Sequence, residues 1–286
     1  MSVSLVTDSV ASIPADLLAS NAIEVVSLFI NDGDSNQAEL DMDVKAFYRR
    51  LEDMQTLPTS SQPSIDSVLT AFKRGLERGC DVLGIFISEK MSGTFQTARM
   101  AAGMLADEYP GGRIEVLDSR SNSMEEGYGV LAAAAKAKAG ASIEACVAAA
   151  SETLRRTRYL FTPHTLEYLR RGGRIGGASA LIGGLLQIKP ILTVEEGETQ
   201  TFARVRTQGR ALAEMTRKFT DDTREFGLAN VCVHYISDEE TAANYAREQI
   251  EPLVGEAVRV IPVSPVIGLH VGPAVAIVYT TQKDWA

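Results

Sequence analysis

DVLGIFISEKMSGTFQ, residues 81–96, decides the fold of this chain. Residues 82–87 form an apolar run without a polar face, which is typical of a strand covered on both sides in a parallel sheet. A short polar connection then leads to Ser92-Gly93-Thr94 and to a helical pattern that ends near Pro110. The stretch therefore predicts a buried strand, a turn and the start of a helix.

The turn has two interpretations. A helix begins with unpaired N–H groups and a partial positive charge, so small hydroxyl residues at that point make an anion site. Ser92 or Thr94 is equally typical of a residue that only caps its helix. The turn alone leaves both interpretations open.

Composition excludes several classes of function. The 286 residues predict two domains or one large one, and the net charge of -9 disfavours nucleic acid or an anionic membrane as the main partner. The opening residues lack the pattern of a signal peptide, and the uncharged residues 260–279 are interrupted by prolines, so no membrane helix is expected. We expect a cytoplasmic protein.

The cysteines indicate neither a disulfide framework nor a zinc site. Cys80, Cys146 and Cys232 are widely spaced, and the chain has only three His. We expect these cysteines to be small buried hydrophobic residues, and we expect no metal or cofactor.

Two further strands of the first half end in Asp-Ser. Residues 3–7 lead to Asp8-Ser9, and residues 113–117 lead to Asp118-Ser119. Because the carboxyl ends of parallel strands form one ligand-binding edge, both pairs are expected to lie beside Ser92-Gly93-Thr94. Strands alternate with helices up to about residue 160, which predicts a doubly wound α/β domain over residues 1–160.

A polar segment, Leu57-Pro58-Thr59-Ser60-Ser61-Gln62-Pro63-Ser64, connects two predicted helices in this half. Its hydroxyls are either preorganised donors or the side chains of a solvated turn. Ser64 is expected to cap the helix that follows. Residues 23–30, earlier in the chain, read as one strand.

The second half, residues 161–286, predicts an α/β domain with antiparallel pairing. Residues 188–194 and 201–205 read as a hairpin, and residues 274–280 as a final strand. Residues 264–273 read as a Gly/Pro-shaped loop that holds His270, which either bonds to backbone or acts as a functional donor. The run RRGGRIGG, residues 170–177, lacks the Lys-Ser/Thr of a phosphate-binding loop, and its arginines form a solvated face or a docking patch.

Seven motifs in order resemble those of one family, the DegV family of bacterial fatty-acid-binding proteins, over nearly the whole chain. The motifs are Thr7-Asp8-Ser9, Thr59-Ser60-Ser61-Gln62-Pro63-Ser64, Ser92-Gly93-Thr94-Phe95-Gln96, Asp118-Ser119, Tyr168-Leu169-Arg170-Arg171-Gly172-Gly173-Arg174-Ile175, Ile188-Lys189-Pro190-Ile191-Leu192 and Gly268-Leu269-His270-Val271-Gly272-Pro273. The chain departs from the family pattern at Ser60, where Thr is usual, and at Ala274, where Gly is common.

The resemblance implies a two-lobed α/β fold with a long-chain fatty acid between the lobes. It implies that the carboxylate is bound by Ser60, by Ser92 with Gly93 and Thr94, and by His270. The tail requires apolar walls, for which the sequence offers Leu28, Phe29, Leu181, Ile182, Leu185 and Leu186, although core packing explains these residues equally well.

The resemblance also implies a partner, a fatty acid kinase that phosphorylates the bound acid, with Arg170, Arg171 and Arg174 in the docking region. The chain itself is then a carrier without catalytic residues. The alternative is a serine hydrolase with Ser92 as nucleophile, His270 as base and Asp118 or Asp8 orienting it. Against the alternative, Ser92 lacks the Gly-x-Ser-x-Gly elbow.

Overall fold

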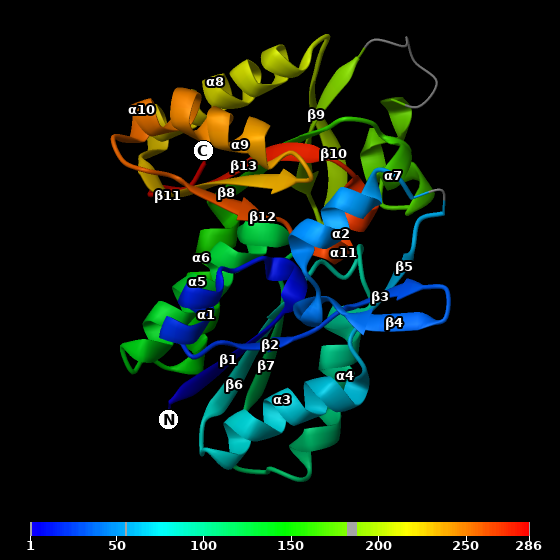
Figure 1. Cartoon of the computed structure of the whole chain (residues 1–286). Coiled ribbons are helices and arrows are strands. Elements are labelled where there is room, and N and C mark those ends of the chain that lie inside the picture. The colour runs from blue at the N-terminus through cyan, green and yellow to red at the C-terminus, as the bar shows by residue number, and fades with distance from the viewer. Residues whose placement is uncertain (1, 55, 182–187, 286) are drawn as a thin grey trace. The chain divides into compact units, whose positions relative to one another are not determined.

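The computed structural model describes residues 2–54, 56–181 and 188–285. The chain forms two compact units, shown in Figure 1. Unit 1 comprises Met1–Met42 and Thr59–Arg155, and unit 2 comprises Asp43–Pro58 and Arg156–Ala286. The division of the sequence into domains 1–160 and 161–286 stays a prediction.

Unit 1 contains a parallel sheet, as predicted, and this sheet has four strands. Its strand order is β2-β1-β6-β7, and every neighbouring pair is parallel. The strands are β1 (Val3–Asp8), β2 (Glu24–Val26), β6 (Asp81–Phe86) and β7 (Ile114–Asp118). Every residue of β6 after Asp81 is buried, which agrees with a strand covered on both faces.

Helices cover both faces of this sheet (Figure 1). Apolar side chains of α3 and α4 pack with Val6, Val82 and Phe86 on one face. The helices of unit 1 are α1 (Ala15–Ser20), α3 (Ile65–Glu77), α4 (Thr94–Ala106), α5 (Ser123–Lys138) and α6 (Ile143–Arg155), with the short 3-10 turns η1 (Ser9–Ala11) and η2 (Glu39–Asp41). Ser64 caps α3, as predicted, by accepting the N–H of Ser67 at 3.2 Å.

A small antiparallel sheet in unit 1 was not predicted. It has the order β4-β3-β5, formed by β3 (Phe29–Asp32), β4 (Ser35–Ala38) and β5 (Thr59–Ser61). The single strand expected over residues 23–30 is therefore wrong: the Leu28 N–H bonds to the Ser9 hydroxyl at 2.9 Å, and the chain leaves the parallel sheet there. The solvated-turn interpretation is also wrong for β5, whose backbone pairs with β3.

Unit 2 contains a mixed six-stranded sheet of order β10-β9-β8-β13-β11-β12. Among the described strands of this sheet, β11 and β12 pair in parallel and the other neighbours pair antiparallel. The predicted hairpin is confirmed, since Glu196 and Gly197 turn with φ of 51° and 82° between its strands. The strands are β8 (Thr157–Pro163), β9 (Lys189–Glu195), β10 (Glu198–Val205), β11 (Leu228–Ile236), β12 (Arg259–Pro262) and β13 (Ala274–Thr281).

The helices of unit 2 include one from early in the chain. That helix, α2 (Val44–Leu51), buries Phe47, Tyr48 and Leu51, and its Tyr48 hydroxyl donates to the Val263 carbonyl at 2.6 Å. The others are α7 (Glu167–Arg171), η3 (Gly176–Leu181), α8 (Gln208–Phe226), α9 (Glu239–Tyr245), the π-turn η4 (Ala246–Ile250), α10 (Glu251–Val254) and α11 (Pro265–Val271). No described helix is long and apolar enough to span a membrane.

The loop predicted over residues 264–273 is wrong, because most of it is helix α11. Ser264 caps this helix through the Ile267 N–H, Pro265 occupies its first turn, and Gly272 ends it with φ of 72°. Nearly all of its side chains are buried, so the sequence has no polar face from which helical spacing is readable. His270 therefore lies in the last turn of a helix.

The cysteines are reduced thiols in two kinds of environment. Cys146 and Cys232 are buried, as expected. Cys80 is only half-buried, contrary to the expectation; it lies just before β6, with its Sγ atom 3.0 Å from the Ser2 hydroxyl.

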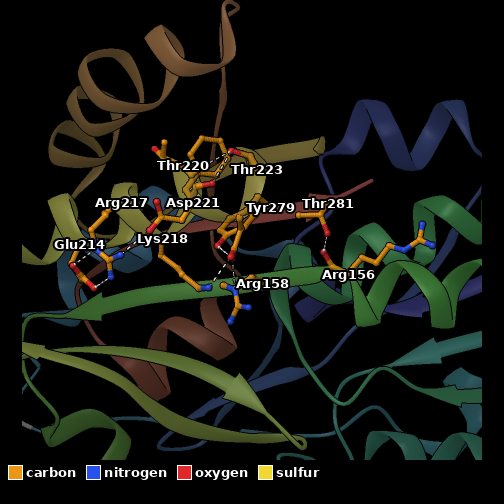
Figure 2. Close-up of polar contacts among 12 residues, drawn as sticks. Arg156, Arg158, Glu214, Arg217, Lys218, Thr220, Asp221, Thr223, Tyr279 and Thr281 are labelled. Atoms are coloured by element: carbon orange, nitrogen blue, oxygen red, sulfur yellow. Dashed lines mark hydrogen bonds and ion pairs between the residues drawn. The ribbon is translucent and has the colours of Figure 1, made fainter. Parts of the chain in front are cut away.

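Asp222 of α8 joins this helix to two strands of unit 2, and Figure 2 labels its partners Arg158, Lys218 and Tyr279. Its carboxylate accepts from Arg158 of β8 at 2.9 Å, from Lys218 at 2.7 Å and from the Tyr279 hydroxyl of β13 at 2.7 Å. Arg158 also stacks on Trp285, 4.7 Å from the ring centre. Asp222 is buried and accepts from three donors, so its charge is compensated where α8 packs on β8 and β13.

We predict that Asp222→Ala lowers the free energy of unfolding of unit 2 by about 3 kcal/mol, because it leaves a partly buried arginine and a buried hydroxyl without their acceptor. Asp221→Ala is the matched control: this neighbour is exposed and pairs with Arg217, so its loss lowers the free energy of unfolding by no more than about 0.5 kcal/mol. Urea unfolding followed by Trp285 fluorescence measures both. Equal effects of the two substitutions would contradict the assignment.

Candidate functional site

Both Asp-Ser pairs lie at the carboxyl edge of the parallel sheet, as predicted, and they hold the loop that leads to Ser92. Asp8 is buried, and its carboxylate accepts the N–H of Ile87 at 2.9 Å and of Val10 at 3.1 Å. Asp118 accepts the N–H of Glu89 at 3.3 Å and of Arg120 at 2.8 Å. The two aspartates thus satisfy backbone donors that strand pairing leaves unpaired.

The same loop is also fixed by a bond within it and by bonds to the residues that follow β7. The Ser88 N–H donates to the Ser121 carbonyl at 2.9 Å, and the Ser88 carbonyl accepts from the Ser92 N–H at 3.1 Å. Ser119 completes the edge, because its N–H donates to the Phe86 carbonyl at 2.9 Å. The backbone position of Ser92 is therefore determined by contacts with residues at the ends of β1 and β7.

Ser92 and Thr94 form a hydroxyl pair at the N-terminus of α4. Their oxygen atoms are 2.9 Å apart, and the Thr94 N–H donates to the Ser92 hydroxyl at 3.3 Å. Gly93 is the N-cap residue and has no side chain to cap the helix. Thr94 is fully buried and Ser92 is half-buried. Their hydroxyls and the first backbone N–H groups of α4 lie at the positive end of a helix of 13 residues.

Ser60 lies in β5 of the same unit, where it is paired with Ile30 of β3. Two residues later, the Gln62 side chain donates to the Thr97 hydroxyl of α4 at 2.6 Å. The polar segment that carries Ser60 is thereby linked to the helix that begins at Ser92-Gly93-Thr94. The structure thus places the predicted site residues of unit 1 on two segments that contact each other; these residues are Ser60, Ser92, Gly93 and Thr94.

Unit 1 also contains a buried acid that the sequence did not indicate. Glu126 of α5 is fully buried, accepts from the Thr7 hydroxyl at 3.2 Å, and has an Oε2 atom without a partner among the described residues. Burial raises the pKa of Glu126 well above its ordinary value, and the charge of Asp8 raises it further. Burial likewise raises the pKa of Asp8 to about 7, with a smaller contribution from Glu39.

The only signal for Glu126 is its place early in an alanine-rich helix, where acidic residues are common at the positive end. Such a residue normally faces solvent, so the sequence gives no reason to expect it inside. Within the described part of the chain, no group of three or more His, Cys, Asp or Glu is arranged to bind a metal ion.

His270 lies in unit 2 and packs against α7. A Cβ atom on Gly172 would overlap the His270 ring, so the glycine allows this close approach. Burial lowers the pKa of His270 to about 4, and the charge of Arg174 lowers it further. At neutral pH the imidazole is therefore uncharged and can donate one N–H. Ala274, which follows Gly272-Pro273, begins β13 and pairs with Pro163 of β8.

The three predicted docking arginines surround the end of α7 in unit 2. Glu167 accepts from Arg170 at 2.6 Å and from Arg171 at 2.7 Å, and these two side chains lower the pKa of Glu167 to about 2. Arg174 donates to the Gly172 carbonyl at 2.6 Å. About half of the side-chain surface of Arg170 and of Arg171 is exposed, so both remain available to a partner.

The predicted tunnel walls are only partly described. Leu28 is buried, Phe29 and Leu181 are half-buried, and Ile182, Leu185 and Leu186 lie outside the described residues. The hydrolase alternative gains no geometric support from unit 1, because the Ser92 hydroxyl contacts Thr94 and both aspartates accept backbone N–H groups.

Comparison with known proteins agrees with the architecture. A family model described as an uncharacterised protein of the DegV family matches residues 2–282. A DegV domain-containing protein of Clostridium acetobutylicum is 40% identical over 290 residues, which cover 99% of each chain. The parallel sheet of unit 1 and the mixed sheet of unit 2 define an α/β protein.

Solved structures agree as well. A DegV family protein of Thermus thermophilus, described by its fatty acid binding, has a TM-score of 0.86 and 31% identity, covering 98% of this chain and 100% of its own. DegV of Bacillus subtilis, described as a fatty acid binding protein, has a TM-score of 0.85 and 30% identity, covering 98% and 99%. The chain belongs to the DegV family.

We predict that Glu126→Gln makes the stability of unit 1 less dependent on pH. An acid with a raised native pKa keeps its proton where the unfolded chain has lost it, so wild-type stability falls as pH rises above about 4.5. The slope for one such group approaches about 1.4 kcal/mol per pH unit. Glutamine retains the acceptor for Thr7 without ionising, and is therefore expected to stabilise the protein at alkaline pH.

Urea unfolding followed by circular dichroism between about pH 5 and 9 measures this difference. Glu77→Gln, a substitution in the last turn of α3, is the control for the removal of one negative charge. Parallel stability curves for wild type and Glu126→Gln would contradict the raised pKa.

Proposed function

We propose that this chain is a carrier that binds a long-chain fatty acid, with the carboxylate at Ser92-Gly93-Thr94. The observation that carries the proposal is the hydroxyl pair of Ser92 and Thr94 at the N-terminus of α4, on a loop held by Asp8 and Asp118. The likeness to the proteins of Thermus thermophilus and Bacillus subtilis that are described as fatty acid binding supports it.

The head group is matched by donors rather than by a nucleophile. A carboxylate accepts charge-assisted hydrogen bonds, which are about twice as strong as neutral ones. Ser92, Thr94 and the backbone N–H groups at the start of α4 supply such donors, and the helix adds its partial positive charge. Ser60 and the neutral imidazole of His270 are proposed as the remaining donors.

The tail supplies most of the affinity. Burying about fifteen methylenes at about 0.8 kcal/mol each gives an upper limit of about 12 kcal/mol, before the cost of ordering the acid. Leu28, Phe29 and Leu181 are proposed as part of the apolar wall. The head-group donors then set the orientation of the acid and supply the smaller share of its binding free energy.

We predict that the double variant Ser92→Ala/His270→Ala binds oleate at least tenfold more weakly than wild type, because each substitution removes a bond to a charged group. Calorimetric titration of delipidated protein measures the affinity, and mass spectrometry of the untreated protein identifies any acid carried through purification. Ser20→Ala, an exposed serine whose hydroxyl donates to the Leu17 carbonyl, is the control. Unchanged oleate affinity in the double variant would refute the proposed head-group site.

The second part of the proposal concerns the fate of the acid. We propose that the carrier works in the cytoplasm and presents the carboxylate to a fatty acid kinase, which forms the acyl phosphate. The exposed arginines of α7 suit such a role, because a partner carboxylate can compete with Glu167 for their guanidinium groups.

We predict that Arg170→Ala/Arg171→Ala reduces acyl phosphate formation by a bacterial fatty acid kinase roughly tenfold and leaves oleate affinity within about twofold. Product formed from labelled ATP measures the handover. Arg217→Ala is the matched control, because Arg217 makes the same helical ion pairs with Glu214 and Asp221 on α8. A parallel loss of acid binding in the α7 variant would contradict a separate docking patch.

A further inference from the structure

Gln62 connects the two segments of unit 1 that carry the proposed head-group donors. Its amide donates to the Thr97 hydroxyl at 2.6 Å, and Thr97 lies one turn into α4, with only 6% of its surface exposed. The Thr97 N–H in turn donates to the Gly93 carbonyl at 2.9 Å. The side chain of Gln62 thus reaches the first turn of the helix that begins at Thr94.

The Gln62 side chain lies so close to Gly93 that it leaves no room for a side chain there. A Cβ atom on Gly93 would overlap the Gln62 Oε1 atom and lie 2.9 Å from its Cδ atom. The backbone of Gly93 does not itself require glycine, because its φ of -75° and ψ of 0° are open to any residue. The glycine is therefore explained by the position of the Gln62 side chain and not by backbone geometry.

The segment around Gln62 is fixed on both sides. Before it, Ser60 pairs with Ile30 in the small sheet, and the Ser61 hydroxyl accepts from the Asn31 amide at 3.3 Å. After it, Pro63 is buried and Ser64 caps α3. With both flanks held, the bond from Gln62 to Thr97 sets the spacing between β5 and the start of α4.

We propose that Gln62 is a positioning residue, which holds the Ser60 hydroxyl and the Ser92-Thr94 hydroxyl pair at the separation that one carboxylate requires. This inference rests on the proposed function. It assigns to Gln62 no contact with the acid: the residue acts through the two segments that it joins. Preorganisation of this kind lowers the cost of assembling donors from separate segments.

The first test compares a charged and an uncharged ligand with the same tail. In Gln62→Ala, oleate affinity falls roughly five- to tenfold, whereas affinity for methyl oleate changes less than about twofold. A merely structural role lowers both affinities together. Gln37→Ala, at an exposed glutamine of β4, is the matched control and leaves both affinities unchanged. Equal losses for the two ligands, or an oleate affinity that does not change, would overturn the assignment.

The second test needs no ligand and uses a double-mutant cycle. Gly93→Ala forces the Gln62 side chain away from Thr97, so it lowers the unfolding midpoint in the wild-type background. In the Gln62→Ala background the added methyl meets no side chain at that position, and the same substitution costs nothing. An equal effect of Gly93→Ala in both backgrounds would refute the contact.

The two tests separate the inference from the function on which it rests. If wild type binds neither oleate nor methyl oleate, the fatty-acid proposal fails, and the positioning role fails with it even if the cycle shows the contact. If wild type prefers oleate and Gln62→Ala retains that preference, only the positioning role fails.

Discussion

The bond from the Ile87 N–H to the buried carboxylate of Asp8 is the contact on which the proposed binding turn depends. A parallel strand that ends inside a protein leaves backbone donors without partners, and a buried donor without a partner costs about 1–3 kcal/mol. Asp8 removes this cost at the end of β6, and Asp118 does the same two residues later at Glu89. The loop to Ser92 therefore has little freedom to move before a ligand arrives.

The electrostatic cost of this arrangement falls on Asp8 and Glu126. Burial raises the pKa of both groups, so the edge that anchors the loop becomes less favourable as either carboxyl loses its proton. Unit 2 treats its buried acid differently: Asp222 is surrounded by Arg158, Lys218 and the Tyr279 hydroxyl, which compensate its charge. Backbone amides thus hold the buried carboxyl of Asp8, whereas two cations and a hydroxyl hold that of Asp222.

A helix or strand of this protein can be predicted from the sequence where its residue pattern gives a local signal of burial. The run at residues 82–87 and the strand ends at Asp8 and Asp118 were predictable, because burial on both faces and Asp-Ser punctuation are local signals. Helix α11 was not, because a helix buried on all sides has no periodicity. Strand β5 was not, because three consecutive hydroxyl residues show no apolar alternation, although their backbone pairs with β3. Gln62 and Glu126 owe their roles to partners distant in sequence.

The chain passes from unit 1 to unit 2 and back before it completes unit 1, and this path constrains the order of folding during synthesis. Residues 43–58 belong to unit 2, yet the segments on both sides of them belong to unit 1. The Tyr48 hydroxyl bonds to a carbonyl 215 positions later, so helix α2 emerges from the ribosome long before its partners exist. Its apolar face, formed by Phe47, Tyr48 and Leu51, stays exposed to other hydrophobic surfaces throughout that interval. A fragment that stops at residue 155 carries a helix with nowhere to pack, and one that begins at residue 156 lacks part of its own core.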